Sequence, residues 1–197
     1  MNSKIVVLIV ACMTVLISVV AYELNVDQGL RSNDDNVREA ALKSVLAQGP
    51  EAELGVPNDY FRAPLYDSDA NVSISAINVL THRKIADFND DLMVLLVEGE
   101  NTIRAAAAKA LGVLSDKETA TLPLWRSLSD LDESVRHQAI ASIDILHKTR
   151  LGFYYDQDPE KYRIRARSAL KEYLEIREDE VDSHAAKKYG SSDKTDK

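Results

Sequence analysis

The chain has 197 residues, a formal net charge of −8, and contents of 45% hydrophobic and 28% charged residues. These values are ordinary for a chain with a packed core. The small numbers of Gly (7) and Pro (5) argue against a mostly disordered chain or a turn-rich β protein. The negative charge argues against nucleic acid as the main partner, and the single cysteine, Cys12, excludes an intramolecular disulfide and a cysteine-based zinc cluster.

An uncharged segment, residues 5–22, follows Lys4 near the start of the chain. Eighteen helical residues span about 27 Å, close to the hydrocarbon thickness of a bilayer. We predict a transmembrane signal anchor over residues 1–22; the alternative is a signal peptide that is cleaved near Ala21, which would leave a secreted or periplasmic protein. Lys4 before the segment and Glu23 after it place the following chain on the extracytoplasmic side, the periplasm of a Gram-negative cell. A buried helix of a soluble core is disfavoured, because the segment is apolar on all faces.

Cys12 lies inside this segment, after Ile9, Val10 and Ala11. These four residues resemble the bacterial lipobox, in which the cysteine becomes lipidated. Residues 13–22 are still apolar, however, where a lipoprotein normally has a polar tether. We therefore expect Cys12 to be a small apolar residue of the membrane helix, with lipidation as the alternative.

One pattern occurs four times in the rest of the chain, at intervals of 35, 31 and 32 residues. A branched apolar residue marks each copy, with an acidic residue three positions before it, an alanine four positions after it and an apolar residue eight positions after it. In chain order the copies contain Asp34, Val37, Ala41 and Val45; Asp69, Val72, Ala76 and Leu80; Glu100, Ile103, Ala107 and Leu111; and Asp132, Val135, Ala139 and Ile143. A recurrence of this length with helical internal spacing predicts a helical solenoid.

Each position of the pattern has a physical role in a helix. The acidic residue begins the helix, where its carboxylate accepts hydrogen bonds from unpaired backbone N–H groups. The branched residue and the residues four and eight positions later lie on one face, which we expect to be buried. The alanine permits close packing of neighbouring helices. Arg38, Arg104 and Arg136 follow the branched residue in three repeats, and we expect them to pair with the acidic residue that begins the helix of a neighbouring repeat. The second repeat has Ser73 at this position.

A partner helix is expected before each of these helices, so that the two form a hairpin. The expected partner helices are 58–66, 90–98 and 119–129, with a truncated one at 24–30. The predicted boundaries are 1–22 for the anchor, 23–177 for the repeat domain and 178–197 for a charged flexible tail, with repeats near 24–48, 58–83, 90–114 and 119–148 and a degenerate cap at 151–177. The predicted fold is all-α: a short right-handed α-solenoid of about four to five helical hairpins, preceded by an N-terminal hydrophobic helix.

The fourth repeat has the most distinctive sequence, with Leu122-Pro123-Leu124 followed by Leu128, Asp130, Asp132, Val135, Arg136 and Ala139. On these residues the chain, over about residues 24–150, resembles the HEAT-repeat family, in particular the short bacterial repeats of the phycobiliprotein-lyase type. The resemblance implies a solenoid whose second helices line a concave, partner-binding surface. It does not imply one activity, because such repeats serve many unrelated functions.

The sequence contains no recognisable catalytic pattern. Its histidines are His82, His137, His147 and His184, and none has metal-ligand spacing or forms the His-Glu pair of deoxyhypusine hydroxylase, an iron enzyme built from similar repeats. No Gly-rich phosphate loop and no nucleophile elbow occur. Five aspartates gather near predicted turns, and we expect them to be caps and solvated residues rather than calcium ligands: Asp67, Asp69, Asp87, Asp90 and Asp91.

We therefore predict a non-enzymatic, membrane-tethered scaffold on the extracytoplasmic side, without cofactor or metal, that binds a protein or peptide but no nucleic acid. Residues 5–22 would hold it to the membrane. The alternative is an accessory structural subunit of an envelope enzyme or secretion complex, and a metal-dependent or lyase-type enzyme is less favoured. The partner-binding residues expected on the concave face are Arg38, Glu39, Lys43, Ser73, Asn78, Arg104, Lys109, Arg136, His137 and Gln138.

Overall fold

The computed structural model describes residue 21, residues 25–50 and residues 57–148. All secondary-structure elements assigned in these residues are helices, which confirms the all-α class. Four predictions lie outside the described residues: the N-terminal hydrophobic helix, the state of Cys12, the degenerate repeat at 151–177 and the tail at 178–197. Within the described ranges, no helix is both long and apolar enough to cross a membrane.

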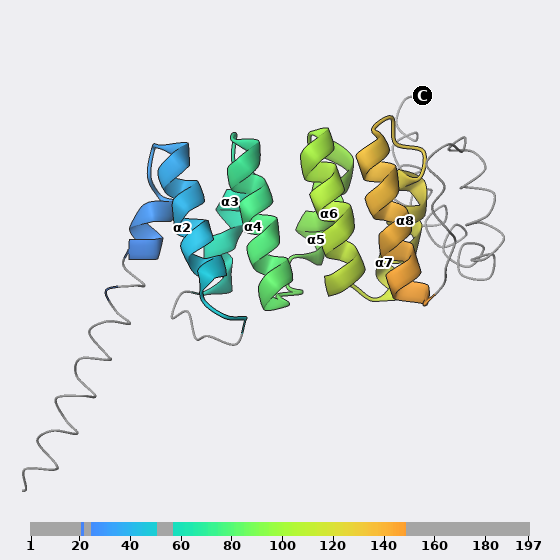
Figure 1. Cartoon of the computed structure of the whole chain (residues 1–197), viewed down its shortest axis with the longest axis horizontal. Helices are drawn as coiled ribbons and strands as arrows, with labels where there is room; N and C mark the ends of the chain where they lie inside the picture. The colour runs from blue at the N-terminus through green and yellow to red at the C-terminus, as the bar shows by residue number, and fades with distance from the viewer. Residues whose placement is uncertain (1–20, 22–24, 51–56, 149–197) are drawn as a thin grey trace, which may run out of the picture. The chain divides into compact units, whose positions relative to one another are not determined.

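The helices follow one another in the predicted hairpin order (Figure 1). The second helices of the four repeats are α2 (Asp35–Ala47), α4 (Ala70–Arg83), α6 (Asn101–Leu114) and α8 (Glu133–His147). They are preceded by a helical segment at residues 25–30, by η1 (Asn58–Phe61) with α3 (Arg62–Leu65), by α5 (Asn89–Glu98) and by α7 (Lys117–Ser127).

The start of α7 differs from the prediction. The helix begins at Lys117 rather than Thr119, because the Asp116 side chain accepts a hydrogen bond from the Thr119 backbone N–H at 2.7 Å. This is the usual geometry of an N-terminal cap. Asp116 therefore marks the start of α7, which the spacing of apolar residues alone does not reveal.

The chain divides into two compact units, Met1–Asp91 and Leu92–Lys197, called here the first and the second unit. In the first unit α2 packs against α4, and α3 packs against α4. In the second unit α6 packs against α8, and α7 packs against α8 (Figure 1). Each unit therefore has its two second helices side by side, while the right-handed path of a complete solenoid stays a prediction.

The buried face of the second helices is confirmed, with one exception. All four alanines and all four of the later apolar residues are buried. Among the branched residues, Val72 and Val135 are 0% exposed and Ile103 is 7% exposed, but Val37 is 43% exposed. The prediction was wrong for Val37 because the described residues contain no earlier repeat that could cover it.

The acidic caps are likewise confirmed in three of four repeats. Asp34, Asp69 and Asp132 each accept a hydrogen bond from the backbone N–H two residues later, and the last two also accept one from the third residue. Glu100 occupies the N-cap position of α6 but makes no side-chain cap hydrogen bond. Cap positions prefer Asp, Asn, Ser or Thr, whose short side chains reach the adjacent N–H groups.

Close helix packing in the second unit depends on a glycine. A Cβ atom added to Gly112 of α6 would lie only 2.8 Å from Ser142 Cα of α8. Beside this contact, the Ser142 hydroxyl donates a hydrogen bond of 2.8 Å to the Ala108 carbonyl of α6. The two helices therefore approach each other through small residues and are joined by a hydrogen bond between side chain and backbone.

Candidate functional site

Arg38, which follows the branched residue of the first repeat, links the first repeat to the second. Arg38 of α2 donates from Nε to Asp67 Oδ2 at 2.7 Å and from Nη2 to Asp67 Oδ1 at 2.8 Å. Its remaining nitrogen, Nη1, donates to the Ser32 carbonyl at 2.9 Å. Only 15% of the Arg38 side chain and 10% of the Asp67 side chain are exposed. This guanidinium group is therefore fully used in joining the first repeat to the second.

The same link occurs in the second unit. Arg104 of α6 donates from Nε and Nη2 to the two carboxylate oxygens of Asp130 at 2.8 Å, and from Nη1 to the Gly99 carbonyl at 2.9 Å. Arg136 of α8 donates to the backbone carbonyls of Asp130 and Leu131. The predicted pairing with a neighbouring repeat is confirmed for Arg38 and Arg104.

The acidic partner is not the cap residue itself but the aspartate two positions before it. Asp67 precedes the cap Asp69, and Asp130 precedes the cap Asp132. In both cases the carboxylate also accepts a hydrogen bond from the backbone N–H of the cap residue. The sequence signal for this link is two aspartates separated by one residue. The first aspartate pairs with the arginine, and the second caps the helix.

These pairs change the acidity of their carboxyl groups. The hydrogen bonds from Arg38 lower the pKa of Asp67 below its ordinary value, against the opposing effect of burial. Burial would by itself raise the pKa of Asp130, but the hydrogen bonds from Arg104 and from the backbone of Asp132 outweigh it, and the pKa is lowered. Both carboxylates are therefore held in the charged form by the fold.

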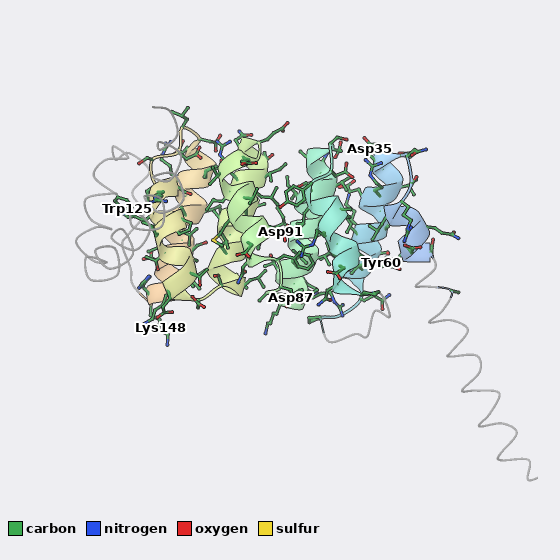
Figure 2. The ribbon with its side chains drawn as sticks, turned by 180° about the vertical axis from the view of Figure 1, so that it is seen from behind. Asp35, Tyr60, Asp87, Asp91, Trp125 and Lys148 are labelled. Carbon is green, nitrogen blue, oxygen red and sulfur yellow. The ribbon has the colours of Figure 1, made fainter. Side chains whose placement is uncertain are left out.

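The second repeat, which has no arginine at this position, is built differently. Ser73 is 0% exposed and its hydroxyl donates to the Leu65 carbonyl, so the expectation that it belongs to a binding face was wrong. Asp91 instead accepts hydrogen bonds from Arg62 Nη1 at 2.7 Å and from the Tyr66 hydroxyl at 2.9 Å (Figure 2). The Arg62 guanidinium also lies 4.9 Å from the centre of the Phe88 ring, a cation–π contact.

Two turns of each second helix present an exposed stripe. Its members lie six and ten positions after the branched residue, on the side away from the buried face. They are Lys43 and Ala47 on α2, Asn78 and His82 on α4, Lys109 and Val113 on α6, and Ala141 and Ile145 on α8, and all eight are exposed. We call these residues the exposed stripe. They differ in size, polarity and charge from one repeat to the next.

Apart from the buried Ser73, the predicted binding residues separate into two groups. Lys43, Asn78 and Lys109 lie on the exposed stripe. The others are half-buried, and several have partners on their own helix or in their own unit: Glu39 pairs with Lys43 at 2.7 Å, His137 lies 3.3 Å from Glu133, Arg38, Arg104 and Arg136 make the contacts described above, and Gln138 lies beside them on α8.

The structure adds two apolar residues that the sequence analysis did not select. Val113 of α6 is 48% exposed and Ile145 of α8 is 58% exposed, at equivalent positions of two helices that pack together. Apolar residues at helical spacing are usually part of the core, so the predicted binding face contained only polar and charged side chains. Their spacing of ten residues from Ile103 and Val135 is the signal that identifies them.

The aspartates near the turns do not gather into a metal site. Asp67 and Asp91 are in ion pairs, Asp69 caps α4, and Asp87 accepts a hydrogen bond from Asn58 at 3.1 Å (Figure 2). Across the described residues, no group of three or more His, Cys, Asp or Glu side chains is placed to hold a metal ion. Their arrangement fits the expected role in caps and turns.

Comparison with known proteins agrees with this geometry. Residues 60–144, which run from η1 into α8, match the family model described as HEAT repeats. No curated protein matches the chain in the corresponding search. The particular bacterial type of repeat stays a prediction. Over residues 60–144 the chain is therefore similar to HEAT repeats.

Proposed function

We propose that this protein is a non-enzymatic scaffold, tethered to a membrane, that binds a protein or peptide through the exposed stripe of its second helices. HEAT repeats commonly bind protein partners, which supports the general class. The observation that carries the proposal is that different residues of each second helix serve the fold and the exposed surface. Branched residues, alanines, caps and arginines make the contacts of the fold, whereas the exposed stripe makes few of them.

The stripe of the second unit offers the more distinctive surface. It combines two apolar side chains, Val113 and Ile145, with the small Ala141 and the positive charge of Lys109. Apolar groups in the centre of a patch with a charged residue at its edge are typical of protein-binding surfaces. Because Ala141 is small, a partner side chain can approach the helix backbone there.

Substitution of Ala141 tests this surface without disturbing the core. A photo-reactive amino acid at position 141 of the full chain, in native membranes, is expected to cross-link to one defined partner. Ala141→Arg is expected to weaken binding of that partner by about tenfold or more, because a long charged side chain fills the contact. The matched control is Thr119→Arg on α7, which introduces the same side chain at an exposed position outside the exposed stripe. A partner that binds the Ala141→Arg variant as well as the original chain would contradict the proposal.

The tether is supported by the length and lack of charge of residues 5–22. We expect the full chain to sediment with membranes and to resist extraction at alkaline pH, and a chain beginning at residue 23 to be released. Protease added outside the cytoplasmic compartment should digest the repeats. Mass spectrometry of the mature N-terminus distinguishes the two alternatives: a start at Met1 or Asn2 supports the anchor, and a start at Tyr22 indicates a cleaved signal peptide instead.

A further inference from the structure

A groove of about 350 Å³ lies between the first helices of the second unit. Met93, Leu96 and Val97 of α5 form one wall, and Pro123 and Arg126 of α7 form the other. We call it the α5–α7 groove. It lies on the first helices, so an occupant of this groove would leave the exposed stripe of α6 and α8 accessible.

The surroundings of the groove are more apolar than the fold requires. Val97 is 75% exposed and Val94, one turn earlier, is 41% exposed. Leu131, next to the lining residue Asp130, is 99% exposed. The corresponding residues of the three other repeats are Asn33, Ser68 and Gly99. Leu131 therefore departs from the repeat pattern, and it makes no contribution to the core.

The charge at the groove is positive. Two charged residues line it, Asp130 and Arg126. The carboxylate of Asp130 is neutralised by its two hydrogen bonds from Arg104. Arg126 is exposed, and its guanidinium group makes no ion pair or hydrogen bond with any residue that the structure describes. The groove therefore presents the positive charge of Arg126 beside an apolar surface.

The groove between the first helices of the first unit provides a comparison. It has a similar volume, about 330 Å³, and its lining includes Asp27, Arg31, Asp59 and Tyr60. Here Arg31 is already bound to Asp27 at 2.7 Å and lies 6.0 Å from the centre of the Tyr60 ring. Among the described residues that line this groove, Arg31 is the only cation and is already paired, and Asp59 adds a negative charge.

We propose that the α5–α7 groove binds a peptide segment of a partner protein in which bulky apolar side chains flank a carboxylate. The apolar side chains would lie against Val97, Met93 and Leu131, and the carboxylate would accept hydrogen bonds from Arg126. A guanidinium–carboxylate contact at the edge of an apolar patch gives both orientation and specificity. The net charge of −8 disfavours acidic peptides on the surface as a whole, so the positive charge of Arg126 would favour this place for the carboxylate.

A displayed peptide library provides the probe. The full chain, immobilised in detergent micelles, is used to select peptides, and the dissociation constants of the selected peptides are then measured by fluorescence anisotropy. We expect the selected peptides to share apolar residues around a Glu or Asp. Replacing that acid with Gln or Lys should weaken binding by about tenfold or more, the effect of losing one charged hydrogen-bonding pair.

Variants of the chain locate the peptide. Arg126→Glu and Val97→Asp should each weaken binding by about tenfold or more, and Arg126→Glu should bind the Lys-containing peptide better than the acidic one. Both residues are exposed, so circular dichroism should show unchanged melting. The matched control is Lys148→Glu, which reverses a charge at an exposed position outside both the groove and the exposed stripe and should leave the dissociation constant unchanged. Lys109→Glu is measured separately to test whether the peptide binds the exposed stripe instead.

Four results would overturn the proposal. The first is the absence of any selected peptide, and the second is a set of peptides without acidic residues. The third is binding that survives Arg126→Glu and Val97→Asp but is lost in Lys109→Glu, which would place the peptide on the exposed stripe. The fourth is a self-associated chain that becomes monomeric with Arg126→Glu in sedimentation experiments, which would make a second copy the occupant.

Discussion

At the scale of single residues, Arg38 and Arg104 show how a charged side chain becomes part of the framework. Each uses three nitrogens, two for a carboxylate in the next repeat and one for a backbone carbonyl near the start of its own helix. Arginine suits this role because its planar guanidinium presents parallel donors to a carboxylate. Each contact therefore joins two repeats and also orders the turn between two helices.

Removal of the Arg104 side chain should destabilise the fold, because the Asp130 carboxylate loses its charged partner. We expect Arg104→Leu to lower the free energy of unfolding by about 1–2 kcal/mol, because Asp130 keeps its charge in a half-buried position. The value is smaller than for a fully buried pair, since 21% and 14% of the two side chains remain exposed to screening solvent. Urea denaturation followed by circular dichroism measures the change. Arg126→Leu, on the exposed side of α7, should change stability by less than about 0.5 kcal/mol.

The same pairs should make the protein sensitive to acid. The pKa values of Asp67 and Asp130 are lower in the folded chain than the ordinary value of 3.8. Below about pH 4 the unfolded chain therefore binds more protons than the folded chain, and stability falls as the pH falls further. The stabilisation is fully present above this pH.

Thermal melting between pH 7 and pH 3 tests this dependence. The variant Asp67→Asn with Asp130→Asn should be less stable at pH 7 but should lose less stability on acidification. Asp90→Asn is the control, because Asp90 is exposed and makes no ion pair within the described part of the chain. An unchanged acid dependence in the double variant would show that other carboxyl groups determine it.

At the scale of the helical element, the start of each second helix depends on the chemistry of one side chain. Asp69 accepts hydrogen bonds from the backbone N–H groups of Asn71 at 2.8 Å and Val72 at 3.2 Å, whereas Glu100 makes no such bond. The two residues occupy equivalent positions of the repeat. The acidic charge alone therefore does not identify a cap; the length of the side chain also matters.

This difference predicts unequal effects of the same substitution. Asp69→Ala should lower the free energy of unfolding by about 1 kcal/mol, the usual cost of losing an N-cap. Glu100→Ala should lower it much less, because no cap hydrogen bond is lost. Denaturant titration of both variants decides the point, and equal losses would mean that charge at the helix start, rather than hydrogen bonding, is the main contribution.

The close packing of α6 against α8 leads to a second prediction about stability at the scale of the helical element. Gly112→Leu should lower the free energy of unfolding by about 1–3 kcal/mol or more, because the added side chain meets Ser142 and pushes the helices apart. Gly49→Leu is the control, since no heavy atom lies within 4 Å of a Cβ added there. Similar melting temperatures for the two variants would contradict the close packing at Gly112.

At the scale of the whole molecule, two alanines on one helix separate folding from binding. Ala139 of α8 is 0% exposed and lies in the core of the second unit, whereas Ala141, two residues later, is exposed. The alternation follows from the helical period, which turns residues two positions apart to nearly opposite sides. The same substitution at both positions can therefore test the core and the proposed binding surface separately.

Ala139→Arg should abolish the cooperative unfolding transition of the second unit, because an unpaired charge is buried against neighbouring helices. Ala141→Arg should keep the melting temperature within a few degrees of the original chain. Differential scanning calorimetry of the full chain measures both. A normal transition in Ala139→Arg would mean that the register assigned to the repeats is wrong.

The repeat pattern was enough to predict most of the fold. The spacing of Val72, Ala76 and Leu80, and its recurrence in the other repeats, identified the helices, their buried faces and most of their caps. The binding face was predicted less completely. Arg38 and Arg104 were expected to be available to a partner as well as paired between repeats, and Val113 and Ile145 were overlooked because apolar residues at helical spacing are usually core.

By itself the sequence determined the periodic part of this protein: four helical repeats, their register and the alanines at their contacts. These properties depend on residues three, four and eight positions apart, which one helix places on one face. The tertiary structure decided how the remaining side chains are used. Contacts with segments distant in the sequence decide which side chains are paired, available or exposed, as for Arg104, Arg126, Val37 and Leu131. Local spacing carries no information about those contacts.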